Sequence, residues 1–243
     1  MRLIRFLPIF LVALPLAEQN HYYTTTFPAT ENPICQDAGN GCTWINGGQT
    51  GLDWGDVQTS ANVVFGVSEP SQFGDPSAAL TGTWTADQTV QATVYVNSPP
   101  TNCCHEVELR LRMAISPHKA TGYEVTCSVV PSSPYVQIVR WNGALGDFTY
   151  VNTTGNGYCA KGDVLKATIS GSTITVFKNG TQILQGSDST FTNGTPGMGF
   201  YDNTDGSWSD FGFSNYTASD SAYNGGSQQP SAPTKLTGSV VQK

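Results

Sequence analysis

Four charged side chains alternate along one short run of the sequence and are the groups best placed to do chemistry. They are Glu106, Glu108, Arg110 and Arg112. Because side chains on a β-strand point alternately to its two faces, this spacing predicts a single row with neighbours roughly 7 Å apart. Paired carboxylates suit glycoside hydrolysis, in which one protonates the leaving group and the other acts as nucleophile or base. Arginines beside them suit bidentate binding of a uronate carboxylate.

Aromatic side chains in turn-rich segments form a second set of candidate binding groups. Sugar rings stack on such side chains while nearby polar groups bond the hydroxyls. We expect Tyr123, Arg140, Trp141 and Asn142 to take part in such binding. For any single aromatic residue, packing in the core is the competing interpretation.

The composition narrows the classes of function. Charged residues make up 12% of the 243-residue chain, and the formal net charge is −7. The charged share is about half the usual value. Scarce basic charge argues against nucleic-acid partners and anionic membrane surfaces. With 26 Gly, 14 Pro and 11% aromatic residues, the composition is typical of an all-β secreted protein with many turns.

Short β-like runs separated by turn residues must position the charged row. Residues 88–97 and 105–113 alternate cleanly between apolar and polar side chains. Further strands are expected at 122–130, 135–141, 164–170, 172–177, 182–184, 197–201 and 211–216. Asn179-Gly180 is the strongest hairpin signal. Many short strands with one apolar face predict an all-β, antiparallel two-sheet sandwich.

The order of these runs carries a resemblance to a known superfamily. The segments Tyr135 to Gly143, Gly162 to Ile169, Ile174 to Gly180 and Pro196 to Phe200 resemble the concanavalin A-like lectin/glucanase superfamily. The similarity is to its laminin-G-like form in secreted bacterial proteins and covers roughly residues 44–217. It implies a jelly-roll sandwich. It leaves the function open, because the superfamily holds lectins, glycoside hydrolases, polysaccharide lyases and adhesion modules.

The charged row departs from the enzymes of that superfamily. Its jelly-roll glucanases carry a Glu-x-Asp-x-Glu or Glu-x-Asp-x-x-Glu strand, whereas here Arg110 follows the two acids. Its alginate lyases carry Arg-x-Glu-x-Arg, Gln-Ile-His and a late Tyr-rich strand. This chain has Val139 in place of the histidine, and no matching tyrosine base. A further interpretation is a set of cross-strand ion pairs on a solvent-facing sheet.

The six cysteines predict disulfide bonds in an oxidising compartment. Cys35 and Cys42 enclose a short Gly-rich loop, and we expect them to pair. The other four leave several pairings open: Cys103, Cys104, Cys127 and Cys159. A metal site of Cys103, Cys104 and His105 is disfavoured, because adjacent cysteines lack the usual ligand spacing.

Calcium is the one metal that the sequence suggests. The run 202–206 contains Asp202 and Asp205 as candidate ligands. It lacks the full pattern of an EF-hand loop, and a polar turn explains it equally well. We expect no other cofactor.

The chain divides into four segments. Residues 1–17 have a basic start and a short apolar run, which predict a signal peptide and hence an extracellular or periplasmic protein. Residues 18–43 are expected to be an extension with a disulfide loop, and residues 44–221 the jelly-roll domain. Residues 222–243 are expected to be a linker or tail that is similar at its end to the start of a truncated fibronectin type III module.

These observations together predict a secreted, non-catalytic carbohydrate-binding or adhesion module whose partner is a polysaccharide or glycan. The alternative is a polysaccharide lyase or glycoside hydrolase that uses Glu106, Glu108 and Arg110, with Arg112 on the same face. A module that only spaces other domains is a third hypothesis. Neither nucleic acid nor membrane insertion after signal removal is expected.

Overall fold

Alternating apolar side chains organise the chain into strands that share one interior. The computed structural model describes residues 21–35, 41–67, 74–144, 146–203 and 208–223, so the predicted signal peptide and most of the predicted tail lie outside the described residues. Within that part the strands are β1 (Tyr22–Thr25), β2 (Trp44–Asn46), β3 (Asp56–Ser60), β4 (Val63–Val67), β5 (Ser77–Leu80), β6 (Gln88–Val96), β7 (His105–Ser116), β8 (Lys119–Ser128), β9 (Val136–Gly143), β10 (Phe148–Gly155), β11 (Val164–Ser170), β12 (Thr173–Lys178), β13 (Thr181–Ser187), β14 (Thr195–Asp202) and β15 (Phe211–Asp220). Two 3-10 turns, Gly48–Thr50 and Trp208–Asp210, are the helical elements of the described residues.

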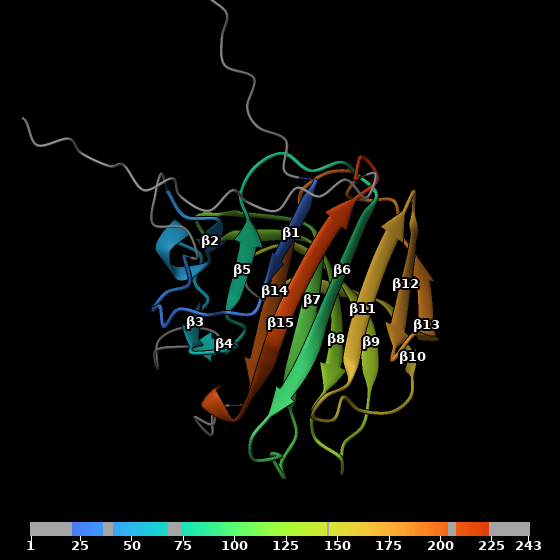
Figure 1. The fold of residues 1–243 in the computed structure, drawn as a ribbon. Helices are drawn as coiled ribbons and strands as arrows, with labels where there is room; N and C mark the ends of the chain where they lie inside the picture. The colour runs from blue at the N-terminus through green and yellow to red at the C-terminus, as the bar shows by residue number, and fades with distance from the viewer. Residues whose placement is uncertain (1–20, 36–40, 68–73, 145, 204–207, 224–243) are drawn as a thin grey trace, which may run out of the picture.

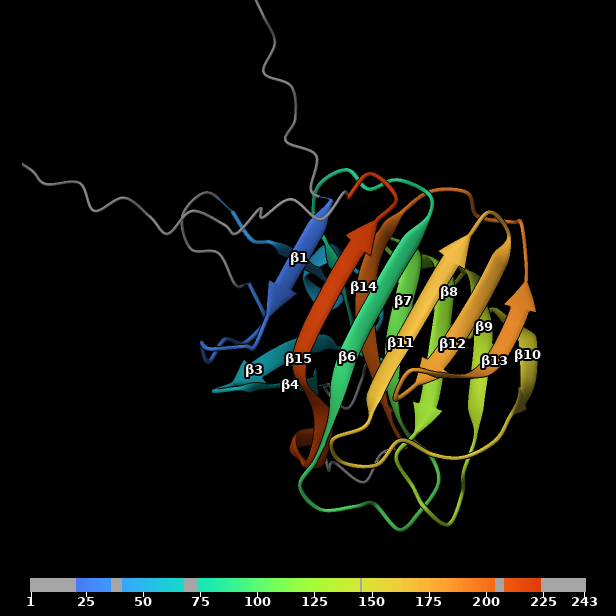
Figure 2. The same cartoon turned by 45° about the vertical axis from the view of Figure 1, so that its right-hand side comes forward.

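The strands form two antiparallel sheets that face each other (Figures 1 and 2). The eight-stranded sheet has the order β13-β12-β11-β6-β15-β4-β3, with β1 also paired to β15. The seven-stranded sheet has the order β10-β9-β8-β7-β14-β5-β2. The predicted all-β, two-sheet jelly-roll sandwich is therefore confirmed.

The core lies between the two sheets and follows the predicted alternation. In β6, Val90 and Val94 point inward and are almost fully buried. In β7, Val107, Leu109 and Leu111 do the same from the opposite sheet. The other side chains of β7 must therefore point to the outer face of the seven-stranded sheet.

The predicted hairpin at Asn179-Gly180 joins β12 to β13. Asn179 has φ 51° and Gly180 has φ 81°. Positive φ at both central residues is the condition for the two-residue turn that matches strand twist, and Asn-Gly is the pair that adopts it most easily. This local signal is confirmed.

The described residues between 22 and 34 pack into the sandwich, although the sequence suggests an extension there. Strand β1 pairs along its whole length with β15, and Phe27 and Ile34 are buried in the core. Where β1 begins and β15 has just ended, the rings of Tyr22 and Tyr223 stack with their centroids 4.7 Å apart. The two ends of the described chain therefore lie side by side.

The described residues contain three disulfide bonds. The expected bond between Cys35 and Cys42 is confirmed, and the open pairings resolve as Cys103–Cys104 and Cys127–Cys159. The last bond ties the end of β8 to the loop before β11. In the described residues there is no helix both long and apolar enough to cross a bilayer.

Candidate functional site

The outer face of the seven-stranded sheet carries three of the four charged side chains of the predicted row. Glu106, Glu108 and Arg110 alternate with core residues of β7 and point away from the interior. They lie opposite Ser128, Thr126 and Glu124 of β8, respectively. The strand therefore positions this part of the row as the two-residue period predicts.

Arg112 does not belong to that row, and its predicted place was wrong. The register of β7 shifts between Leu111 and Ala114, and Arg112 has φ 48°. The guanidinium of Arg112 donates hydrogen bonds of 2.7–2.8 Å to backbone carbonyls, which belong to Ala86, Phe191 and Gly171. A β-bulge thus redirects the side chain to tie three loops together.

Arg110 lies at the centre of a cluster of three carboxylates, hereafter the carboxylate cluster: Asp75, Glu108 and Glu124. Its guanidinium contacts Asp75 and Glu124 at 2.5 Å and also bonds Glu108. All four side chains are buried. The interpretation as solvent-facing ion pairs is therefore wrong, because the ions are removed from water.

Glycines on the neighbouring strand make room for this cluster. Gly199 of β14 lies opposite Glu108, and Gly197 lies opposite Arg110. A Cβ atom on Gly199 would collide with the Glu108 carboxylate and lie 2.8 Å from an Arg110 nitrogen. The side chains of β7 therefore lie across β14 at places where only hydrogen fits.

Two buried tryptophans pack against the guanidinium. The Arg110 carbon Cζ lies 5.6 Å from the ring centroids of both Trp54 and Trp141. The two rings are in edge contact at 4.4 Å, and Trp141 Nε1 donates to Glu124 at 2.6 Å. Trp141 thus shares the predicted face, where it covers Arg110 and orients one carboxylate.

Burial and mutual repulsion perturb the cluster's protonation. Burial raises the pKa of Asp75 to about 8, although Arg110 opposes the shift. Burial also raises the pKa of Glu108 well above its ordinary value. For Arg110, burial works against the charge, but the carboxylates outweigh it and raise its pKa. The three acids of the carboxylate cluster therefore share the single positive charge of Arg110, and they cannot easily all be ionised at the same time.

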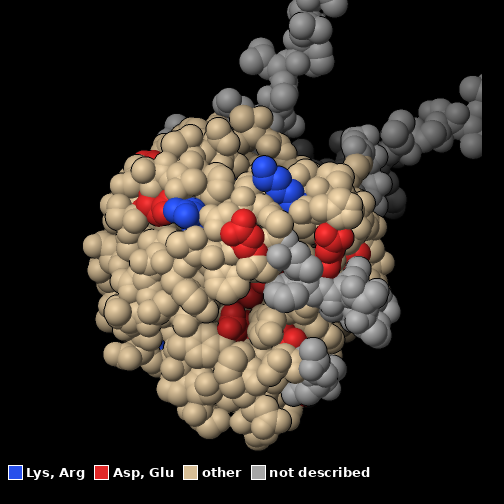
Figure 3. Space-filling model, turned by 180° about the vertical axis from the view of Figure 1, so that it is seen from behind, with Lys and Arg blue, Asp and Glu red and all other residues tan. Residues whose placement is uncertain are grey.

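Glu106 lies beside the cluster and is less deeply buried. Its carboxylate accepts hydrogen bonds from Thr126 Oγ1 at 2.5 Å and from the Tyr135 hydroxyl. Burial, reinforced by the charge of Glu124, raises the pKa of Glu106 to about 7. Seen from outside, acidic side chains lie at the bottom of a hollow on this face (Figure 3).

Two aromatic side chains are exposed at the edge of the same face. Phe148 and Tyr150 of β10 are 40% and 54% exposed. The Phe148 ring lies 5.3 Å from Trp141 on one side and 5.3 Å from Tyr150 on the other. An aromatic strip therefore runs from the cover of Arg110 to the sheet edge. Strand β10 is not among the strands expected from the sequence.

Arg140 and Asn142 do not share the face of Trp141, although the three are consecutive. Arg140 donates to Asp188 at 2.5 Å, and both Arg140 and Asn142 donate to Thr149. Alternation along β9 places them on the other side of the sheet from Trp141. There Arg140 holds the segment after β13 against the edge of the sandwich, and Asn142 bonds the start of β10.

Tyr123 is a core residue and not a surface platform. It is 1% exposed, and its ring contacts Phe191 at 5.9 Å. Its hydroxyl donates to the Asp188 carboxylate at 2.8 Å. Packing thus explains Tyr123, as the competing interpretation of single aromatics allowed.

The carboxylate cluster has a donor set of the kind that holds metals, since ligand atoms of its three acids lie within 4.8 Å of one another. The Arg110 guanidinium contacts all three acids, so one positive charge already lies among them. Calcium would compete with Arg110 for the same carboxylate oxygens, and calcium binding stays a prediction. Asp202 is buried and its carboxylate lies 3.4 Å from His105, while Asp205 lies outside the described residues.

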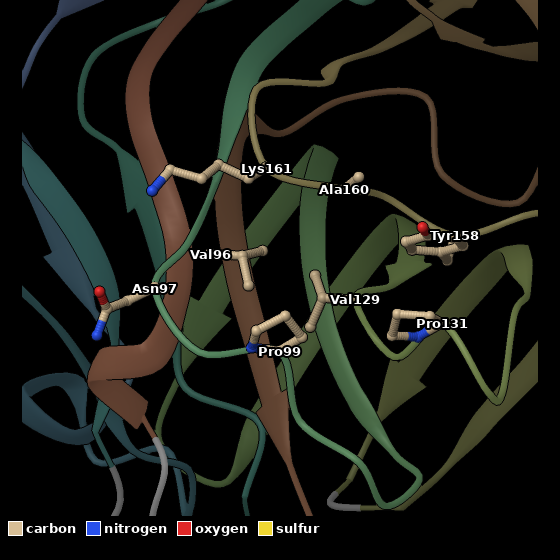
Figure 4. Close-up of a pocket in the computed structure, with 8 residues that line it drawn as sticks. All are labelled: Val96, Asn97, Pro99, Val129, Pro131, Tyr158, Ala160 and Lys161. Atoms are coloured by element: carbon tan, nitrogen blue, oxygen red, sulfur yellow. The ribbon is translucent and has the colours of Figure 1, made fainter.

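A second depression opens at one end of the sandwich and has a volume of about 240 Å³. Its lining comes from the ends of β6 and β8 and from the loop before β11: Val96, Asn97, Pro99, Val129, Pro131, Tyr158, Ala160 and Lys161. The side chains of Asn97 and Lys161 extend away from the apolar wall (Figure 4). Polar groups thus do not converge there as in the hollow.

Comparisons with known proteins support the fold. No family model and no curated protein sequence matches the chain. Among solved structures, carbohydrate binding module CBM66 from Bacillus subtilis is 14% identical, with a TM-score of 0.51 over 73% of this chain and 92% of that one. The VIP36 exoplasmic/lumenal domain in a Ca²⁺- and mannose-bound form is 11% identical, with a TM-score of 0.55 over 84% and 91%.

A third similar structure comes from work on endo-acting O-glycanases of the human gut microbiota that initiate mucin breakdown. It is 8% identical, with a TM-score of 0.53 over 82% of this chain and 98% of that one. At such identities these similarities concern the fold alone. They support the two-sheet jelly-roll sandwich, a fold that serves both binding modules and enzymes.

Proposed function

We propose that this protein is a secreted, non-catalytic carbohydrate-binding module that holds a polysaccharide against the outer face of its seven-stranded sheet. The observation that carries the proposal is the pair of exposed rings, Phe148 and Tyr150, next to a hollow lined by acidic side chains. Rings of this kind stack on sugar faces, and carboxylates accept hydrogen bonds from hydroxyl groups. A carbohydrate binding module and a domain with bound mannose are among the similar structures and support it.

The proposal is tested by retention of the purified protein on immobilised or gel-embedded polysaccharides of neutral, acidic and amino-sugar composition. Tyr150→Ala should weaken binding about fivefold or more, because loss of one aromatic contact costs about 1 kcal/mol. The matched control is Tyr95→Ala, since Tyr95 is a half-buried aromatic residue on the eight-stranded sheet. No retention of the wild type on any polysaccharide would refute the proposal.

A polysaccharide-degrading enzyme is the second candidate, and Glu106 favours it. A carboxyl group whose pKa is raised to about 7 keeps its proton near neutral pH, as a general acid requires. Product release, followed by reducing ends and by the absorbance of unsaturated uronates, tests this candidate. If Glu106→Gln abolished such release, the non-catalytic proposal would be wrong.

Secretion of the protein, its laminin-G-like form and a role in adhesion stay predictions from the sequence. Three disulfides in the described residues favour an oxidising compartment, extracellular or periplasmic. The laminin-G-like form and a role in adhesion rest on the sequence resemblance. Mass spectrometry of the secreted protein would locate the cleavage point after residue 17 or elsewhere.

A further inference from the structure

The disulfide between Cys103 and Cys104 joins neighbouring residues in the loop that connects β6 to β7, at the lower end of the sandwich in Figure 1. Cys103 is exposed and Cys104 is half-buried. By contrast, Cys127 and Cys159 are completely buried. A thiol in solution can therefore approach Cys103 while the protein stays folded, as thiol–disulfide exchange requires.

This bond also differs from the other two in how much chain it closes. Cys103 and Cys104 are separated by 1 position in the sequence, whereas the other pairs are separated by 7 and 32. A disulfide stabilises a fold mainly because it restricts the unfolded chain, and the effect grows with the length of the closed loop. The Cys103–Cys104 bond closes almost no chain, so it adds little to the stability of the fold. By linkage, the fold adds equally little to the stability of this bond against reduction.

Hydrogen bonds hold the two cysteine residues by their backbone. The side-chain amide of Asn203 donates to the Cys103 carbonyl at 2.8 Å, and the backbone N–H of Asn203 donates to the Cys104 carbonyl at 3.1 Å. Directly after Cys104, His105 pairs with Asp202 of β14. These contacts do not involve the sulfur atoms, so they can persist when the disulfide is broken. The two thiols would then stay next to each other, where the bond can form again.

We propose that the Cys103–Cys104 bond is a reversible exchange site for small thiols and not a structural cross-link. A thiolate attacks the Cys103 sulfur, the S–S bond breaks, and Cys104 leaves as a thiolate. A second thiolate, from another molecule or from the same dithiol, attacks the first thiol's sulfur in the mixed disulfide and releases Cys103. The two small thiols lose two electrons and become a disulfide. The two cysteines gain these electrons and take up the two protons that the thiols gave up, and the reverse steps close the bond. This role is independent of carbohydrate binding.

The experiment equilibrates the purified protein at neutral pH with graded ratios of reduced to oxidised dithiothreitol. Free thiols are blocked with N-ethylmaleimide, and the labelled cysteines are located by peptide mass spectrometry. Chymotrypsin is the suitable protease, because the sequence has no Lys or Arg between Cys42 and Cys103 and trypsin would leave these two pairs in one peptide. Half-reduction of Cys103–Cys104 should need a ratio about tenfold lower than Cys35–Cys42 and about a hundredfold lower than Cys127–Cys159.

The Cys35–Cys42 bond is the matched comparison, because Cys42 is also exposed. Reduction of both exposed pairs at the same ratio would overturn the inference, since the length of closed chain would then make no difference. When the protein with a reduced Cys103–Cys104 pair is transferred to oxidised dithiothreitol, the bond should form again. Persistent labelling of both residues after this transfer would overturn the reversibility of the site.

Two double variants test whether the bond is a cross-link. Cys103→Ser with Cys104→Ser should leave the melting temperature within about 2 °C of the wild type, whereas Cys127→Ala with Cys159→Ala should lower it by about 6 °C or more. An equal fall in the two double variants would assign Cys103–Cys104 a structural role and overturn the inference. The labelling experiment uses the wild type alone, so it decides the matter even if a variant fails to fold.

Discussion

Replacing Glu106 by Gln should change how the stability of the protein depends on pH. The pKa of Glu106 is about 7 in the folded protein, against an ordinary 4.5. A raised acid pKa means that the folded state holds the proton more tightly than the unfolded state does. The free energy of unfolding therefore falls as pH rises from the ordinary value through about 7.

The size of the effect follows from those two values. With a single carboxyl that titrates at 4.5 unfolded and about 7 folded, linkage gives a loss of about 2 kcal/mol between pH 5 and pH 8. Glu124, whose charge contributes to the shift, stays in place in the variant. The Gln side chain cannot ionise. Between pH 5 and pH 8 the variant should therefore lose less stability than the wild type, and the difference should be about this amount.

The assay is urea unfolding of both proteins at pH 5 and pH 8, compared as a double difference. Groups with opposite behaviour, such as Asp188 with its lowered pKa, occur in both proteins and cancel. Asp53→Asn is the control and should follow the wild type. An equal change with pH in the wild type and in Glu106→Gln would refute the placement of this carboxyl in a desolvated, acid-rich hollow.

Three further changes test the structure around the hollow. Arg110→Met should cost about 3–5 kcal/mol in urea unfolding at pH 8, because the buried acids lose their cation; millimolar Ca²⁺ should restore part of the loss if the acids then act as ligands. Gly199→Ala should cost about 1–3 kcal/mol, because its Cβ would collide with Glu108. Cys127→Ala with Cys159→Ala should cost roughly 3–4 kcal/mol, the value for a loop of 32 residues, and a wild-type melting temperature would contradict it.

Local patterns in the sequence were enough to predict the core strands and the outward row of Glu106, Glu108 and Arg110. Alternation along β7 is a property of neighbouring residues, so it can be read without knowing the fold. The bulge that redirects Arg112 depends on pairing with β8, which is not visible in the run itself. The burial of the row depends on Trp54, which comes from a distant loop.

The partners of Arg110 were missed for the same reason. Asp75 lies 35 residues before Arg110 and is isolated among other residue types. Glu124 lies in the next strand, but only the register of β7 against β8 brings it opposite Arg110. Strand β10 was missed because it is an edge strand with little apolar surface to bury. Its exposed Phe148 and Tyr150 alternate, and this spacing was the available signal.

The stacked pair of Tyr22 and Tyr223 affects how the module can be joined to others. Because β1 pairs with β15 in the eight-stranded sheet, any segment attached before the first ring or after the second starts from one corner of that sheet. Two proteins fused before Tyr22 and after Tyr223 would thus be attached at the same corner of the sandwich. The outer face of the seven-stranded sheet lies on the opposite side (Figures 1 and 3), so such a fusion would leave that face uncovered.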